Sequence, residues 1–206
     1  MNTNVLKRFI IYMAIATFVM FTVWAFVRSY MNRPPGDYET EVCDIRLKDK
    51  IYDEAMEAAN KALAKTPNHR GAIMCKALIY ISQKDYANAN NELDYLIKYL
   101  ESNLETDDLT GIGTLAAAYA NRGIIKDRNK NYEGALADYI KALGIDHESV
   151  AGPGLGTIIL NYKYKSSSVK NRALYLNEQL QLPEAERVLS IKELDEGQVM
   201  HKPGKL

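Results

Sequence analysis

Residue types that carry chemistry are few and widely separated in this 206-residue chain. The three histidines, His69, His147 and His201, are far apart in sequence, and no HExxH, CxxC or GxSxG motif occurs. The glycine-rich segment 151–156 (AGPGLG) lacks the Gly-Lys-Ser/Thr that follows a phosphate-binding loop. We therefore predict no enzymatic activity, no cofactor and no metal site. A helical enzyme stays a remote alternative that would need coupled titratable groups in a cleft.

One acidic cluster could in principle attract a cation. The segment 101–112 (ESNLETDDLTGI) carries four carboxylates: Glu101, Glu105, Asp107 and Asp108. Their spacing lacks the alternating ligands and central glycine of a calcium loop. We interpret this segment as a continuation of the preceding helix that ends in a solvated loop.

The charges divide the chain into two parts. Lysine and arginine total 26 and aspartate and glutamate total 26, but residues 1–36 hold four bases and no acid. Residues 37–206 therefore carry a net charge of −4, and this excess of acids gives them no electrostatic reason to bind nucleic acid. The length suits one domain with an appendage, and two cysteines exclude a disulfide framework.

The appendage is predicted to cross a membrane. The run from Phe9 to Val27 has no charge, proline or glycine, and as a helix it would reach about 28 Å, close to the thickness of a bilayer core. Tyr12 and Trp24 fall near its two ends, where amphipathic rings suit the headgroup level. We predict a short basic N-terminus at 1–8, a transmembrane helix at 9–28 and a proline-rich linker at 29–36.

Two other interpretations of this segment fit less well. A cleaved signal peptide has a shorter apolar core and a small-x-small site, whereas Ala25-Phe26-Val27 makes a poor site. A buried core helix would need some polar positions. Basic residues flank both ends, so orientation is weakly specified; we expect a cytoplasmic N-terminus and an exported domain, as in a bacterial inner-membrane protein with its domain in the periplasm. A cytoplasmic domain is the alternative.

The remainder repeats. Tyr52, Tyr86 and Tyr132 each precede an alanine by three residues, and apolar or aromatic residues follow at four and seven positions beyond that alanine. The first interval is 34 residues, and the second is 34 plus the 12-residue insertion 101–112. This spacing places the side chains on one face of a helix. Nine residues before each tyrosine stands a small residue, Cys43, Ala77 or Gly123, where a second helix can approach closely.

This pattern of paired antiparallel helices resembles the tetratricopeptide repeat, most closely at 119–148. The resemblance implies an all-α fold: a single transmembrane helix followed by an α-α superhelical solenoid. Three repeats would occupy 37–149, C-terminal capping helices 150–197 and a mobile tail 198–206, although this tail could instead lie along the solenoid. We expect one capping helix over 157–164 and another that starts at Ser168. Cys43 fills a small packing position, so we interpret Cys43 and Cys75 as buried free thiols; a disulfide requires them within about 6 Å.

The resemblance also predicts a partner groove on the leading helices. Its positions are Thr40, Asp44, Leu47 and Lys48 in the first unit, Met74, Leu78 and Ile81 in the second, and Ala117, Ala120, Ile124, Asp127 and Arg128 in the third. We refer to these twelve residues as the predicted groove. Its apolar middle suits an amphipathic helix or an apolar peptide. The alternative is that the protein's own tail or cap covers it.

These observations predict a membrane-anchored protein–protein interaction scaffold without enzymatic activity. Its partners would be proteins of a membrane complex, for which it would act as an assembly or maturation factor or as an accessory subunit. The lipid bilayer would contact residues 9–28. A second hypothesis keeps the anchor but turns the domain to the cytoplasm as a docking receptor, as in mitochondrial outer-membrane import receptors.

Overall fold

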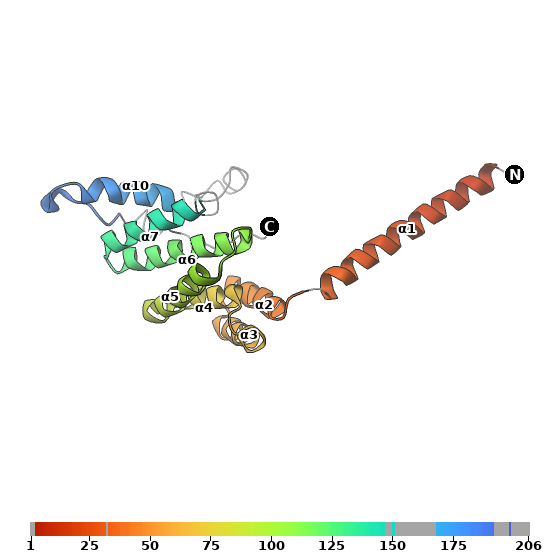
Figure 1. Cartoon of the computed structure of the whole chain (residues 1–206), viewed down its shortest axis with the longest axis horizontal. Coiled ribbons are helices and arrows are strands. Elements are labelled where there is room, and N and C mark those ends of the chain that lie inside the picture. Colours follow the sequence, from red (N-terminus) through yellow and green to blue (C-terminus); the bar gives the residue numbers. More distant parts are fainter. Residues whose placement is uncertain (1–2, 32, 147–149, 151–167, 192–197, 199–206) are drawn as a thin grey trace.

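The computed structural model describes residues 3–31, 33–146, 150, 168–191 and 198, and the helix expected over 157–164 lies outside these residues. The described residues form eight α-helices and one short 3-10 helix (Figure 1). The helices are α1 Thr3–Met31, α2 Asp37–Lys48, α3 Tyr52–Lys65, α4 Arg70–Ser82, α5 Tyr86–Asn103, α6 Leu109–Arg128, α7 Tyr132–Ile145 and α10 Val169–Leu180, followed by η1 Glu184–Glu186.

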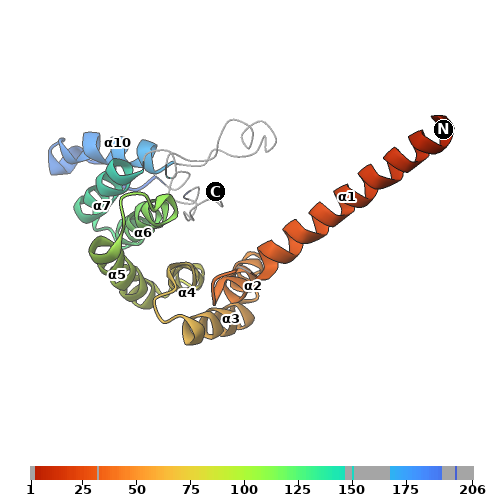
Figure 2. The same ribbon diagram turned by 45° about the vertical axis from the view of Figure 1, so that its right-hand side comes forward.

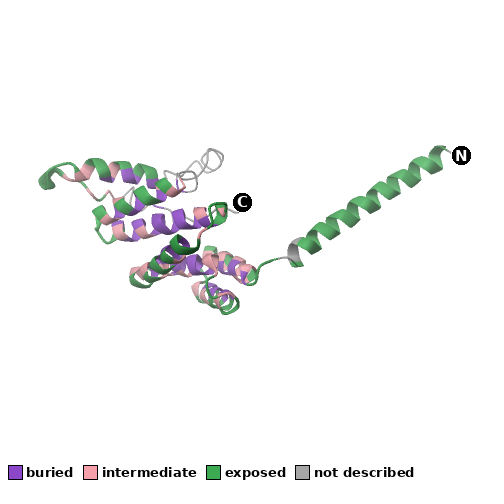
Figure 3. Cartoon of the chain, in the orientation of Figure 1, coloured by how far each residue is buried: buried purple, intermediate pink, exposed green. Residues whose placement is uncertain are grey.

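Helix α1 extends away from the other helices, and its described side chains are exposed (Figure 3). It is long and apolar enough over Thr3–Arg28 to cross a membrane. Exposed side chains such as Phe18, Met20 and Phe26 would be unfavourable in water, whereas a bilayer solvates them. The helix exceeds the predicted 9–28 at both ends, because backbone hydrogen bonding continues into the flanking polar turns.

Helices α2–α3, α4–α5 and α6–α7 form three antiparallel pairs joined by the same turn. In each turn a lysine adopts a left-handed conformation: Lys50 at φ 62°, Lys84 at φ 62° and Lys130 at φ 61°. The backbone bonds also recur, since the amide after each lysine donates to the carbonyl five residues earlier. This is the Schellman arrangement that satisfies the last carbonyls of a helix. The second helix of each pair begins at a tyrosine: Tyr52, Tyr86 or Tyr132. The three tyrosines therefore occupy equivalent positions.

The predicted helical faces are buried, which confirms the periodicity. The alanines three residues after the tyrosines, Ala55, Ala89 and Ala135, have no exposed surface, and the same holds for the positions four and seven residues further on: Ala59, Leu93, Tyr139, Ala62, Leu96 and Ala142. At the small site a Cβ on Gly123 would lie 2.6 Å from Cε1 of Tyr139. A small residue there is therefore required for α6 to approach α7.

Consecutive pairs pack against one another along the chain, since α3 contacts α4 and α5 contacts α6. The leading helices also meet, with contacts between α2 and α4 and between α4 and α6 (Figure 2). Most of the apolar core lies between α4, α5, α6 and α7 and reaches α10. A smaller cluster of mainly small side chains joins α2, α3 and α4.

The free-thiol interpretation is wrong, because Cys43 and Cys75 form a disulfide. Cys43 on α2 and Cys75 on α4 have Cα atoms 6.5 Å apart, within the range that a disulfide spans. Both side chains are fully buried in the smaller cluster. The small-residue periodicity explains the burial of Cys43, but only the side-by-side packing of α2 and α4 brings Cys75 to it.

The insertion lengthens two helices rather than one. Its first three residues complete α5, which ends at Asn103, and its last four begin α6 at Leu109. Asp108 caps α6, since its carboxylate accepts from the amide of Gly111 at 2.8 Å. The insertion is therefore a solvated loop only over its central residues.

The second expected capping helix, α10, begins as predicted after Ser168, whose hydroxyl accepts from the amide of Asn171 at 3.1 Å and caps it. Val169, Ala173 and Leu176 are buried, and α10 packs along α7. Gln198 is buried as well, so this residue of the expected mobile tail is held against the helices. Residues 199–206 lie outside the described part.

Candidate functional site

Most of the predicted groove is buried. Met74, Leu78 and Ile81 on α4 are 1%, 4% and 2% exposed. On α6 the same holds for Ala117, Ala120, Ile124 and Asp127. The amide of Asn121 donates to Sδ of Met74 at 3.6 Å, so the second and third units meet directly along this side. The apolar middle therefore belongs to the core and is not an open surface of this structure.

The exposed part of the predicted groove lies at its rims. Lys48 at the end of α2 and Arg128 at the end of α6 are exposed, and Asp44 and Leu47 are half-buried. The guanidinium of Arg128 lies 5.9 Å from the ring centre of Tyr86, within cation–π range. A partner that approaches this side would first meet these polar and charged ends.

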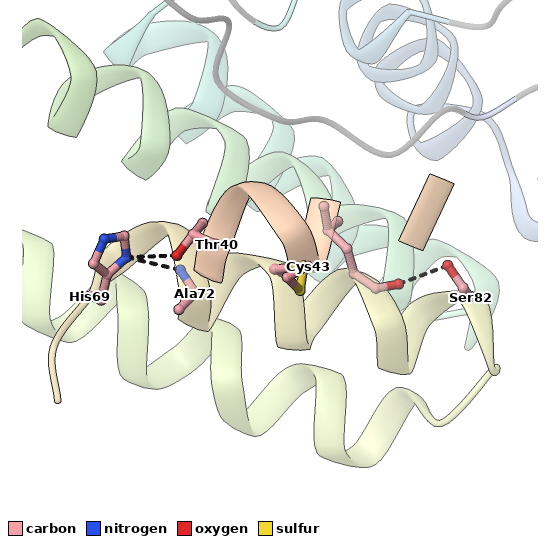
Figure 4. Close-up of a disulfide and its surroundings, with 7 residues drawn as sticks. Thr40, Cys43, His69, Ala72 and Ser82 are labelled. Atoms are coloured by element: carbon pink, nitrogen blue, oxygen red, sulfur yellow. Dashed lines mark hydrogen bonds between the residues drawn. A yellow bond between two sulfur atoms is a disulfide. The ribbon is translucent and has the colours of Figure 1, made fainter. Parts of the chain in front are cut away.

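Thr40 and His69 form a local support for the first two units (Figure 4). Nδ1 of His69 accepts from the amide of Ala72 at 3.2 Å and so caps α4. The same nitrogen lies 3.3 Å from the hydroxyl of Thr40, and Nε2 donates to Asp37 at 2.8 Å. These bonds connect the starts of α2 and α4, and His69 is thereby a structural residue.

A buried polar cluster surrounds Asp127. Arg172 of α10 donates from Nε and Nη2 to the two oxygens of Asp127, each at 2.8 Å, and its side chain is 1% exposed. Nη2 also donates to the carbonyl of Leu189 at 2.8 Å. Two bonds in a fork give this pair its geometric precision. The ion pair thus fastens α10 and the segment after it to the end of α6.

Two further groups complete this cluster. Gln198 donates from Nε2 to Asp127 at 2.8 Å, and the hydroxyl of Tyr139 donates to the same oxygen at 3.2 Å. Burial and the neighbouring carboxylate of Asp127 raise the pKa of Tyr139 well above its ordinary value, so its hydroxyl keeps its proton and acts as a donor. One residue of the predicted groove is therefore occupied by the protein's own C-terminal part.

Sequence reasoning missed Arg172 and Gln198. The sequence places Asp127 in the predicted groove, whereas it is a buried ion-pair partner. The one available signal was Arg172 itself, which lies three residues after Val169 and one before Ala173 on the predicted apolar side of its helix. A base at such a position favours a buried acidic partner.

A second charged cluster joins α5, α6 and α7. Arg122 pairs with Asp94 at 2.6 Å and with Asp138 at 2.7 Å, and its guanidinium lies 5.1 Å from the ring centre of Tyr119. The hydroxyl of Tyr119 donates to Glu101 at 2.5 Å. Burial, with the adjacent Glu101 carboxylate, raises the pKa of Tyr119 to about 12. Arg122 is paired with a carboxylate on α5 and another on α7, so this cluster holds helices together.

The acidic insertion 101–112 is also tied to another helix by an ion pair. Asp108 accepts hydrogen bonds from the guanidinium of Arg70, and this pair with the amide of Gly111 lowers the pKa of Asp108. Within the described residues, no group of three His, Cys, Asp or Glu side chains is placed to hold a metal ion. His147 and His201 lie outside those residues.

No protein-family model matches the chain, and a search of curated proteins finds no match.

Proposed function

We propose that this chain is a membrane-anchored protein–protein interaction module of the tetratricopeptide-repeat kind, without enzymatic activity. Its apolar N-terminal helix serves as an uncleaved anchor, and its repeat domain binds a helix or peptide of a membrane complex as an assembly factor or accessory subunit. The observation that carries the proposal is the threefold recurrence of one helix pair, with the same left-handed turn at Lys50, Lys84 and Lys130. Stacked helix pairs create extended surfaces for other polypeptides.

The disulfide supports an exported domain. Disulfides form and persist in oxidising compartments such as the periplasm and are rare in the cytosol. The Cys43–Cys75 bond lies on the domain side of α1, which favours a cytoplasmic N-terminus over the cytoplasm-facing docking receptor. A bacterial inner membrane with the domain in the periplasm fits this arrangement.

Topology is tested on the full chain in sealed inner-membrane vesicles whose cytoplasmic face points outward. We expect added protease to leave the domain intact until detergent opens the vesicles. We also expect a maleimide reagent to label the denatured protein only after reduction. Cleavage in intact vesicles together with labelling before reduction would support the cytoplasmic alternative.

Partner binding is tested by photo-crosslinking in native membranes. Because Leu78 is buried, a charge placed there would disturb folding; the exposed groove residues Lys48 and Arg128 are better positions for the crosslinker. Lys61, exposed on α3 and paired with Glu57, is the control position. We expect one discrete protein adduct at Lys48 or Arg128 and none at Lys61. Equal crosslinking at all three positions would contradict specific partner binding at the exposed ends of the predicted groove.

A further inference from the structure

The outer face of α2 is the exposed apolar surface nearest to the anchor. Tyr38 and Ile45 are 58% and 53% exposed, and half-buried Val42 lies between them. Their spacing of four and three residues places them on one side of α2. The opposite side, with Thr40 and Cys43, packs into the domain. A terminal repeat usually ends in a polar outer face, whereas this one also carries the apolar side chains of Tyr38, Val42 and Ile45.

The linker from α1 to α2 is short and mostly fastened to the domain. The hydroxyl of Thr66 donates to the carbonyl of Pro35 at 2.7 Å, and Arg33 pairs with Glu41 at 2.9 Å. Gly36 is buried at φ 98°, where a Cβ would lie 2.9 Å from the ring of His69. The domain therefore holds the chain from Pro35 onward.

This attachment limits the distance between α2 and the membrane. Four residue steps separate Met31 at the end of α1 from Pro35, and an extended chain of that length spans at most about 14 Å. A headgroup layer is itself roughly 5–8 Å deep. Both ribbon views place α2 beside the end of α1, while α5, α7 and α10 lie further away (Figures 1 and 2).

We propose that the outer face of α2, formed by Tyr38, Val42 and Ile45, docks on the headgroup layer of the membrane that α1 spans. The contact orients the helical domain on the membrane. This proposal rests on membrane anchoring by α1. The outer face of α2 contacts the bilayer because the short linker holds this face beside the lipid. Tyrosine and aliphatic side chains also suit the depth of the headgroup layer. The linker makes the contact intramolecular, so a small apolar face is sufficient.

The charges around this face agree with a zwitterionic headgroup layer. Arg33 and Glu41 neutralise each other beside Tyr38, and Arg46 pairs with Glu54 at 2.9 Å. Exposed Lys48 and Asp49 at the end of α2 are of opposite sign. The face therefore carries little net charge, and its apolar side chains govern the contact.

The test uses the full chain in phosphatidylcholine vesicles. Trp24 is the single tryptophan, so Trp24→Phe removes the native signal and Tyr38→Trp introduces a reporter on α2. Tyr95→Trp is the matched control, because Tyr95 is a similarly exposed tyrosine (49%) on the distant α5. A lipid with a nitroxide on its headgroup quenches tryptophans that touch the headgroup layer. We expect at least about twofold stronger quenching at position 38 than at position 95, and Ile45→Glu to abolish that difference.

Three outcomes would overturn the docking proposal. Equal quenching at positions 38 and 95 would place α2 away from the lipid. Blue-shifted but unquenched emission at position 38 would show that a second copy of the chain covers the face. If Ile45→Glu left the quenching at position 38 unchanged, α2 would only lie close to the headgroup layer and would not dock on it through its apolar side chains. Vesicle flotation separates these from a failure of the anchor, since a protein that does not float with the vesicles would contradict the proposed function itself.

Discussion

The two ends of the helical domain are held by different means. At the first unit, α2 and α3 contribute mainly small side chains to a small cluster, and the Cys43–Cys75 disulfide ties α2 to α4. At the third unit, alanines and large side chains such as Tyr119, Ile124 and Tyr139 together belong to the main core, and the Asp127–Arg172 pair ties α10 to α6. A covalent bond thus stabilises the end that buries little apolar volume. The other end has enough surrounding core to bury an ion pair.

This difference bears on how each end responds to its surroundings. A reductant breaks a disulfide but does not affect an ion pair. A buried ion pair instead depends on both of its charged partners remaining in place. We therefore expect reducing conditions to loosen the first unit only. The following substitutions test that contrast, from the largest expected effect to the smallest.

The largest effect is expected from Arg172→Met. This change leaves Asp127 buried without its cation, which costs about 3–5 kcal/mol of unfolding free energy. Urea unfolding of the full chain in detergent, followed by circular dichroism, measures it. The double variant Arg172→Met with Asp127→Leu should recover most of the loss, because no buried charge then remains. A single variant as stable as the native chain would contradict the role of this pair.

Removal of the disulfide by Cys43→Ala with Cys75→Ala should cost about 3–4 kcal/mol, because the bond closes a loop with a sequence separation of 32 and restricts the unfolded chain. Thermal unfolding with and without reductant is the measurement. The native protein should lose stability in reductant while the double variant does not change. If reductant affected both proteins equally, the disulfide would not be the cause.

Close packing in the third unit is tested by Gly123→Ala, whose added methyl group would meet the Tyr139 ring. We expect a loss of about 1–3 kcal/mol in urea unfolding, as for other overpacked positions. Gly144→Ala is the matched control on α7, since nothing lies within 4 Å of its Cβ position. The control should be neutral or more stable by up to about 1 kcal/mol through helix propensity. Equal losses in both variants would remove the steric explanation.

The Asp108–Arg70 pair predicts a pH dependence at the start of the third unit. The pKa of Asp108 is lowered in the folded protein, so its stabilising effect is present above about pH 4 and is lost as the pH falls through the lowered pKa. Asp108→Asn keeps a capping oxygen but removes the charge. We expect a loss of about 1 kcal/mol at pH 7 and a smaller difference from the native chain at pH 3. Thermal scans at both values measure it; a difference independent of pH would contradict the assignment.

The smallest effect concerns a feature that the three units share. Lys84 has a left-handed backbone conformation that glycine adopts without strain, so Lys84→Gly should raise stability by about 0.5–1 kcal/mol. Gln83→Gly, one residue earlier and with φ −83°, is the control that should lose stability. Differential scanning calorimetry of both variants gives the comparison. Destabilisation by both substitutions would show that the lysine side chain contributes to the turn.

The local pattern of the chain was predictable because it depends on residues a few positions apart. The 34-residue recurrence located the second helix of every pair, and the structure starts α3, α5 and α7 at the three tyrosines. Ser168 identified the start of α10. The run from Phe9 to Val27 identified the apolar helix, since length and composition alone determine whether a helix can span a bilayer.

The tertiary structure decided every feature that joins distant residues. Cys43 meets Cys75, and Asp127 meets Arg172 across 45 positions, only because helix packing brings them together. The same packing buries Met74, Leu78 and Ile81, which periodicity alone places on a face without stating what covers it. Periodicity fixes the face of a helix on which a side chain lies, whereas its burial and its partner depend on the approach of other helices.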